Sequence, residues 1–321
     1  MPDIQRTTAR ARRIIEEIET VIVGKRHAVE MVAIGLLSNG HVLIEDIPGV
    51  GKTMLAKALA KALGATYRRI QFTPDLLPAD ITGTSIYNQK TAEFVFREGP
   101  VFTNVLLADE INRATPKTQS SLLECMEEFQ VTVDGVTRPL ARPFVVLATE
   151  NPIEYRGTYP LPEAQLDRFL MRIEVGYPNP EQEVEVLNRQ IKEHPIHAVQ
   201  AVVTKEEVLE MQDQVKDIHI DPSLKEYLVQ VVTATRGHEK LSLGGSPRAS
   251  LGLMRTGQAR AVLAGRDYVI PDDIKAMAAA VLCHRLVLRP GVGASGGRRR
   301  QAEAAQVVRE VLEQLPVPAV S

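Results

Sequence analysis

The chain has 321 residues, 44% of them hydrophobic, and a formal net charge of −2. This length predicts one large or two medium domains with an ample core. The near-neutral charge argues against a general polyanion binder, although a local basic patch stays possible. Aromatic residues make up only 4% and tryptophan is absent, so we expect a core of aliphatic side chains.

The cysteines and the N-terminus indicate a cytoplasmic protein in a reducing compartment. Cys125 and Cys283 lie in apolar helical patterns, which predicts buried free thiols rather than a disulfide or a zinc site. Residues 1–6 contain no apolar signal core, and no stretch approaches the roughly 18 apolar residues that span a bilayer. We therefore expect no direct membrane insertion.

Two helices are predicted before the first strand. Residues 9–20 form an amphipathic pattern with isoleucines on one side and arginines on the other. After the short segment 21–24, a second helix is expected over 26–37.

The first chemical motif lies between a predicted strand, 42–45, and a predicted helix, 52–63. It is the turn Pro48-Gly49-Val50-Gly51-Lys52-Thr53. Backbone N–H groups of such a turn, with the positive end of the helix, form a phosphate cradle. Lys52 is expected to reach the β- and γ-phosphates, and the Thr53 hydroxyl to hold Mg²⁺. ATP and Mg²⁺ are the predicted ligands.

The cradle departs from the usual pattern G-x-x-x-x-G-K-[ST] at one position. Asp46 occupies the place of the first glycine. A chance Gly-Lys-Thr turn is the alternative, but the strand and helix on either side favour the cradle. The substitution leaves the early part of the loop in question, not Lys52 or Thr53.

A second acidic motif supports the first. After a predicted strand at 67–72, the apolar run Val105-Leu106-Leu107-Ala108 leads into Asp109 and Glu110, the form of a Walker B segment. At the carboxyl end of a strand, Asp109 is expected to ligate Mg²⁺ through water, and Glu110 to polarise the attacking water. The alternative is a solvated pair that caps a helix before Ile111.

Strands alternate with helices through the first half of the chain, which predicts a parallel, doubly wound α/β sheet. Two hairpins interrupt it. One is expected within 81–96, with its turn at 88–91, and the other over 130–138, where Asp134-Gly135 is a strong two-residue turn signal. The remaining elements of this half are a helix over 116–128 and strands at 144–148 and 171–175.

Prolines at 178 and 180 mark a predicted boundary, and the pattern beyond it is helical. Helices are expected over 180–192, from a capping box at Thr204, and near 222–235, 247–264 and 271 onward. A Gly-rich linker, 291–297, precedes a last amphipathic helix ending near 315. The predicted domains are a nucleotide-binding domain over 1–177, a helical lid over 178–290, and a linker with C-terminal helix over 291–321.

Several segments match one family in order: 22–25, 45–53, 109–114, 148–152, 161–169 and 245–248. Over residues 10–290 the chain resembles the MoxR ATPases, in the helix-2-insert branch of the AAA+ superfamily. The resemblance implies a doubly wound AAA+ domain with hairpin insertions, followed by a smaller all-α lid.

The resemblance also implies roles for single residues. Asn151 resembles sensor 1, which orients the attacking water; the alternative is a turn residue before Pro152. Arg168 resembles an arginine finger that enters the neighbouring subunit's site, where such fingers contribute roughly 10³–10⁵ in rate. The alternative for Arg168 is a pair with Asp167 or Glu163.

Arg248 resembles sensor 2, which contacts the γ-phosphate from the start of a lid helix. Its alternative is a surface arginine in a first turn, where the helix dipole disfavours a positive charge. Val23 and Gly24 resemble the segment that packs on adenine, or else form a helix–loop junction. The nucleotide-binding residues expected in the cradle are Pro48, Gly49, Val50, Gly51, Lys52, Thr53 and Met54.

Two further residues have open interpretations. Arg113 either contacts nucleotide across an interface or pairs with Glu110. Gln71, at the end of its strand, is placed to restrain Glu110 until a partner binds.

The preferred function is an ATP-driven, chaperone-like remodelling protein, active as a homo-oligomeric ring, most simply a hexamer. The resemblance implies assembly or metal loading of enzyme complexes, with a von Willebrand factor A domain protein as partner. The alternatives are a magnesium-chelatase or DNA-associated motor subunit, and a nucleotide-gated scaffold with negligible hydrolysis. Asp134 at a hairpin tip would repel phosphate, so the sequence carries no strong nucleic-acid signal.

Overall fold

Five parallel strands form the central sheet of the computed structural model, in the order β2-β5-β8-β1-β9. The structure describes residues 3–151, 157–191, 193–292 and 297–318. The predicted doubly wound α/β class is confirmed, and strands β1 and β5 have the expected bounds. The sheet strands are β1 (Val42–Glu45), β2 (Tyr67–Gln71), β5 (Val105–Asp109), β8 (Val145–Glu150) and β9 (Met171–Ile173).

The three central strands β1, β5 and β8 are buried at successive positions, so the sheet is covered on both faces there. Ile44, Leu107 and Leu147 point into one buried cluster, which includes the helices near the N-terminus. Leu43 and Leu106 point into the other, which includes α5. The helices of this lobe are α1 (Ile4–Glu19), α2 (Arg26–Leu37), α3 (Lys52–Ala62), α4 (Pro78–Thr82), α5 (Pro116–Glu128) and α6 (Glu163–Leu166).

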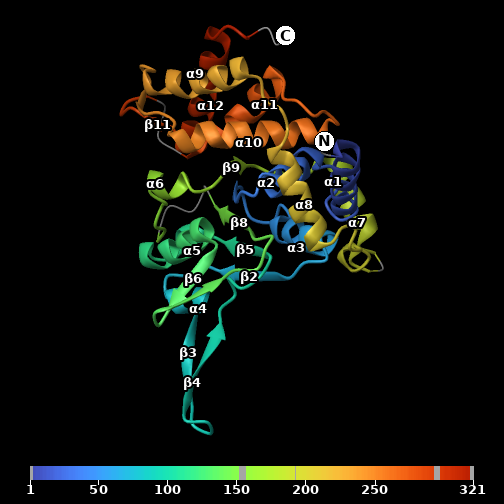
Figure 1. Cartoon of the computed structure of the whole chain (residues 1–321), viewed down its shortest axis with the longest axis vertical. Helices are drawn as coiled ribbons and strands as arrows, with labels where there is room; N and C mark the ends of the chain where they lie inside the picture. Colours follow the sequence, from blue (N-terminus) through green and yellow to red (C-terminus); the bar gives the residue numbers. More distant parts are fainter. Residues whose placement is uncertain (1–2, 152–156, 192, 293–296, 319–321) are drawn as a thin grey trace.

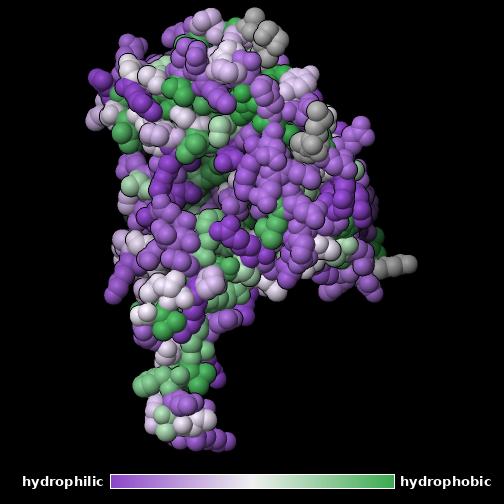
Figure 2. All heavy atoms as spheres, viewed as in Figure 1, coloured by the Kyte–Doolittle hydropathy of each residue, from purple (hydrophilic) through white to green (hydrophobic). Residues whose placement is uncertain are grey.

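Both predicted hairpins are present. Strands β3 (Gly83–Asn88) and β4 (Glu93–Glu98) form an arm that projects from the body (Figure 1) and carries apolar side chains on its surface (Figure 2). Strands β6 (Gln130–Val133) and β7 (Val136–Pro139) turn at Asp134 and Gly135, which have φ of 54° and 74°. Positive φ at both turn residues is the geometry that Asp-Gly favours.

The second half of the chain is helical, as the sequence predicted. Helices α9 to α12 form a separate layer above the sheet in Figure 1, while α7 and α8 lie beside the N-terminal helices. The short pair β10–β11 and helix α4 were not predicted from the sequence. The elements are α7 (Pro180–Arg189), α8 (Lys205–Lys216), α9 (Pro222–Arg236), β10 (Leu241–Leu243), α10 (Pro247–Leu263), α11 (Pro271–Leu282), β11 (Val287–Leu288) and α12 (Gly297–Gln314).

Cys125 and Cys283 are buried free thiols, as predicted. Burial raises the pKa of Cys125 to about 12 and that of Cys283 to about 11. Across the described residues, no helix combines the length and the apolar character needed to cross a bilayer.

Candidate active site

The glycine-rich turn between β1 and α3 is built to receive an anion. Gly49 and Gly51 have φ of 87° and 90°, a conformation that L side chains rarely adopt. A Cβ added to either glycine would meet no described atom within 4 Å, so the surface of the turn is open to a ligand. Gly51 is the N-cap of α3 and supplies no side-chain cap, which leaves the first N–H groups of the helix available.

Asp46 explains the departure from the usual phosphate-loop pattern. Its buried carboxylate accepts hydrogen bonds from the backbone N–H groups of Ile47 (2.8 Å), Val175 (2.7 Å) and Gly176 (2.5 Å). The last two residues follow β9, so the carboxylate ties the start of the turn to the end of the neighbouring strand. The aspartate is therefore an anchor of the turn.

Lys52 lies at the first position of α3 and faces the acidic groups of the site. Its Nζ donates to the carbonyl oxygen of Asp46 at 2.6 Å. Burial lowers the pKa of Lys52, and the charges of Asp46, Asp109 and Glu110 oppose this shift. A half-buried cation held this way has unused N–H donors for a phosphate.

The turn borders a cleft of about 390 Å³ that gathers most of the predicted site residues. Val50 packs against the core instead, and Gly24 accepts a hydrogen bond from Gln182 at 3.3 Å. Val23 and Gly24 are absent from the described lining, so an adenine contact stays a prediction. The lining residues are Pro48, Gly49, Gly51, Lys52, Thr53, Met54, Arg69, Gln71, Asp109, Glu110 and Asn151.

Asp109 ends β5 between two donors. Its Oδ1 accepts from the hydroxyl of Thr149 at 2.6 Å, and its Oδ2 accepts from Arg69 at 2.6 and 3.0 Å. The sequence interpretation missed both partners. An alignment of β5 with its neighbours β2 and β8 could have predicted both partners, because these two strands flank β5 in the sheet.

Glu110 follows Asp109 in the left-handed region, with φ of 56° and ψ of 50°. This conformation costs roughly 1–2 kcal/mol in a residue other than glycine, and such strain is concentrated at functional sites. The backbone N–H of Glu110 donates to the Thr149 hydroxyl at 2.8 Å, which fixes the turn.

Two donors share one oxygen of the Glu110 carboxylate. Gln71 Nε2 lies 2.9 Å from Oε2, and Arg113 Nη1 lies 3.0 Å from it. Gln71 Oε1 in turn accepts from Arg69 at 2.6 Å. Of the two interpretations of Arg113, the pair with Glu110 is present within the chain. The restraint of Glu110 by Gln71 has the contact it requires.

Asn151 directly follows β8 and is 7% exposed. Strand β8 pairs with β5, so Asn151 reaches the same cleft as Asp109 and Glu110. Its predicted neighbour in the motif, Pro152, lies outside the described residues.

The two predicted arginines lie together in another part of the chain and are absent from the described lining of the cleft. Arg168 Nε is 3.2 Å from Glu127 Oε2, and Arg248 Nη2 contacts Glu127 Oε1. Contrary to the alternative for Arg168, its described partner is neither Asp167 nor Glu163. The contact of either arginine with a γ-phosphate therefore stays a prediction.

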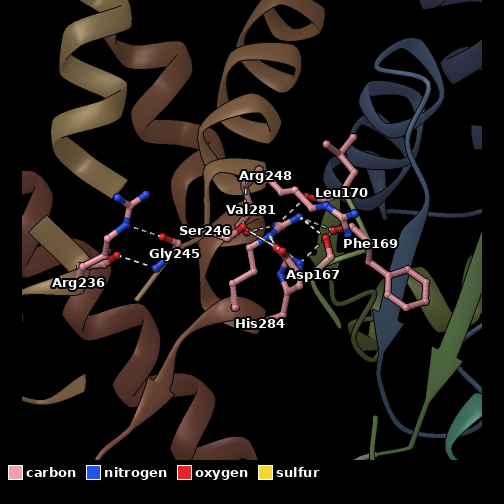
Figure 3. Close-up of polar contacts among 11 residues, drawn as sticks. Asp167, Phe169, Leu170, Arg236, Gly245, Ser246, Arg248, Val281 and His284 are labelled. Atoms are coloured by element: carbon pink, nitrogen blue, oxygen red, sulfur yellow. Dashed lines mark hydrogen bonds and ion pairs between the residues drawn. The ribbon is translucent and has the colours of Figure 1, made fainter. Parts of the chain in front are cut away.

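Asp167 binds the helical lobe. Its carboxylate accepts from Arg285 Nε at 2.7 Å. It also accepts from the Ser246 hydroxyl at 2.9 and 3.1 Å (Figure 3). Ser246 caps α10, because its hydroxyl accepts from the N–H of Arg248 at 3.1 Å. The segment that carries Arg168 is thus joined to the helix that carries Arg248.

The cleft fits a magnesium nucleotide. Thr53 and Asp109 offer the oxygen ligands that Mg²⁺ prefers, and few protein ligands are needed when phosphates and water complete the shell. Among the described residues, no group of three or more His, Cys, Asp or Glu side chains could hold a metal ion.

A parallel sheet, a phosphate cradle, an acidic strand end and a helical lid together define an AAA-type ATPase fold. Residues 41–171 match the model of the ATPase family associated with various cellular activities, and residues 233–311 match the AAA lid domain. The chain is similar over its length to the crystal structure of a proposed ATPase from Cytophaga hutchinsonii. The TM-score is 0.89 at 40% identity, with 98% of this chain and 97% of that one covered.

Similar sequences identify the family within the AAA-type ATPases. "Chaperone MoxR1" of Mycobacterium tuberculosis is 48% identical over 86% of this chain and 75% of that protein. "Protein MoxR" of Paracoccus denitrificans is 31% identical over 97% of each chain, and "Uncharacterized protein YeaC" of Bacillus subtilis is 54% identical over 95% of this chain and 94% of that protein. The chain belongs to the MoxR family of AAA+ ATPases.

Proposed function

We propose that the protein hydrolyses ATP with Mg²⁺ and uses the cycle, as a ring, to remodel partner proteins. The observation that carries the proposal is the division of the site residues. Lys52, Asp109 and Glu110 converge on one cleft, while Arg168 and Arg248 lie together elsewhere in the same chain.

The cleft residues divide the chemistry among them. Lys52 and the N–H groups of the turn bind the β- and γ-phosphates. Thr53 and Asp109 hold Mg²⁺, which when bound neutralises charge on the phosphates. Glu110 accepts the proton of the water that attacks the γ-phosphorus, and ADP is the leaving group. Asn151 orients that water.

The resting contacts of Glu110 favour a regulated cycle. Gln71 and Arg113 both donate to one carboxylate oxygen. A carboxylate oxygen that already accepts two hydrogen bonds is less available to the attacking water. A partner that withdraws these donors would activate the base, so we propose that turnover without a partner is slow.

A ring would bring to each cleft two arginines that are absent from its described lining. Arg168 and Arg248 would reach the phosphates of an adjacent subunit and stabilise the charge of the transition state. We propose a hexamer, in which the helical layer transmits the state of each cleft to the next.

The partner would be a protein with a von Willebrand factor A domain, and the task would be assembly or metal loading of enzyme complexes in the cytoplasm. The relative named a chaperone supports a remodelling role. The projecting β3–β4 arm exposes large apolar side chains, with Phe94 74% exposed, which suits contact with another protein.

The direct test measures ATP binding and turnover in two variants. Glu110→Gln should keep ATP affinity and lose turnover by about 100-fold or more, because the base is gone while the cradle is intact. Lys52→Ala should lose binding itself. Unchanged turnover in Glu110→Gln would remove Glu110 from its role.

Two further arms test the ring and the nucleic-acid alternative. Arg168→Ala should be inactive alone and partly active when mixed with Lys52→Ala, since mixed rings bring an intact cleft beside an intact arginine. Duplex or single-stranded DNA should leave turnover unchanged, and a several-fold stimulation would favour a DNA motor instead.

A further inference from the structure

We propose that Glu127 is a positioning residue that holds Arg168 and Arg248 as one unit for use on a neighbouring subunit's phosphates. The proposal rests on the function proposed above. Glu127 lies near the end of α5 and lines a shallow hollow of about 440 Å³ with both arginines, away from the nucleotide cleft.

The geometry is a carboxylate shared between two lobes of the molecule. Arg168 follows α6 in the α/β lobe, whereas Arg248 lies in the first turn of α10 in the helical lobe. Each takes a different oxygen: Arg168 Nε is 3.2 Å from Oε2, and Arg248 contacts Oε1. One side chain therefore fixes the relative position of two guanidinium groups that belong to separate elements.

The backbones that carry the arginines are already fixed by a different set of contacts. Asp167 accepts from the Ser246 hydroxyl at 2.9 Å, and that hydroxyl accepts from the N–H of Arg248 at 3.1 Å (Figure 3). Arg285 holds the other side of Asp167 at 2.7 Å. With the backbones fixed, the remaining freedom belongs to the long arginine side chains, and Glu127 is the described residue that restricts both.

Glu127 lies between two positive charges, which explains how it can position both arginines. Arg255 and Arg285 also line the hollow, and the described acidic side chains there are Glu127 and Asp167. A carboxylate between two guanidinium groups offsets their repulsion and restricts two long side chains that otherwise have many rotamers. One carboxylate cannot neutralise two arginines, so the unit stays cationic. Each guanidinium has five N–H donors, which leaves donors free for a phosphate.

A purely structural ion pair would have different consequences from a positioning role. If Glu127 prepares the arginines for a transition state in the next subunit, Glu127→Gln should lower kcat by about 10-fold and leave KM for ATP within about 2-fold. Glu127→Asp, which keeps the charge on a shorter side chain, should recover part of kcat. Glu128→Gln on the same helix turn, also exposed, is the matched control and should behave like the unmodified protein.

The decisive experiment places Glu127→Gln in one subunit type of a mixed ring. Arg168→Ala subunits provide intact clefts, and Lys52→Ala subunits provide intact arginines. The reference mixture of the two should recover turnover. Adding Glu127→Gln to the Lys52→Ala subunits should reduce that recovery by about 10-fold. Adding it to the Arg168→Ala subunits should leave the recovery unchanged, because these subunits have lost Arg168 and their remaining Arg248 does not complete an active cleft.

The three mixtures distinguish failure of the role proposed for Glu127 from failure of the proposed function. If the reference mixture does not recover, cross-subunit catalysis is wrong, and the role of Glu127 is wrong with it. If the reference mixture recovers but Glu127→Gln has no effect in either subunit type, only the positioning role is overturned. An equal loss in both subunit types also overturns it, since that would show an effect on folding or on the subunit's own cleft. Thermal unfolding of Glu127→Gln alone should match that of Glu128→Gln.

Discussion

Arg285 donates to the carboxylate of Asp167 at 2.7 Å, where the helical lobe meets the α/β lobe. The same guanidinium donates to the carbonyl oxygens of Phe169 at 2.6 Å and Leu170 at 3.1 Å. Arg285 is only 5% exposed, and burial lowers its pKa against the opposing charge of Asp167. The charge on each of these two residues is thus compensated by the other.

The stability losses from replacing Asp167 and Arg285 should be less than additive. Asp167→Asn leaves the buried guanidinium without a counter-charge, and such a loss costs roughly 3–5 kcal/mol. We expect a decrease of that size in the free energy of unfolding, measured in urea. The double variant Asp167→Asn/Arg285→Met should lose less than the sum of the single changes. Strict additivity would show that the two residues are not coupled.

Asp46 offers a test of the anchor at the start of the cradle. Asp46→Gly restores the usual phosphate-loop glycine but leaves the N–H groups of Val175 and Gly176 without their acceptor. Because each such buried group costs roughly 1–3 kcal/mol, we expect lower stability and weaker ATP binding than in the unmodified protein.

The conservative variant Asp46→Asn keeps one acceptor oxygen. Its stability and ATP affinity should lie between those of Asp46→Gly and those of the unmodified protein. Stability is measured by urea unfolding and affinity by titration with a fluorescent ATP analogue. Tighter ATP binding in Asp46→Gly would mean that the turn prefers the common sequence and that the anchor is dispensable.

Gln71 should restrain the base in the absence of a partner. Gln71→Leu removes one of the donors at Glu110 Oε2 while keeping the side chain's size. The carboxylate is then freer to accept a hydrogen bond from the attacking water, so we expect basal turnover to rise several-fold with little change in ATP affinity. Arg68→Ala, on the same strand and exposed, serves as the control. A fall in turnover would instead make Gln71 a residue that assists catalysis.

Local features of the site could be predicted from the sequence. The cradle depends on glycines and a helix start within a few residues, and the acidic strand end depends on one apolar run. These signals are contiguous in the sequence. Lys52, Thr53, Asp109 and Glu110 line one cleft, and their chemical roles stay predictions. Asn151 lies in the same cleft because β8, which it follows, is next to β5 in the sheet.

Long-range contacts could not be predicted in the same way. The function of Asp46 depends on β9, and the contact of Arg248 with Glu127 joins residues far apart in the chain. A carboxylate on an ordinary amphipathic helix such as α5 carries no local sign that two arginines will meet it. Pairs of this kind are set by tertiary packing, which composition and periodicity do not encode.

His41 gives a prediction for pH. Its Nδ1 accepts from the N–H of Val146 at 3.0 Å, and its Nε2 lies 2.9 Å from the carbonyl oxygen of Met126, so the neutral ring with its proton on Nε2 satisfies both contacts. Burial lowers the pKa of His41 to about 4. An unfolded histidine has a pKa of about 6.5, so below that pH the unfolded chain binds a proton that the folded chain does not. Stability should therefore fall as the pH drops from 6.5 to 4.

The size of the loss follows from the shift: about 2 kcal/mol by pH 5 and about 3 kcal/mol by pH 4. His41→Gln keeps a donor and an acceptor but cannot be protonated, so its free energy of unfolding should depend less on pH over this range. His27→Gln, at an exposed histidine, should keep the slope of the unmodified protein. Urea unfolding at pH 7 and pH 5 measures the difference, and carboxylates that titrate in the same range affect all three proteins alike. Equal slopes in His41→Gln and His27→Gln would show that His41 is protonated as readily in the folded chain as in the unfolded one.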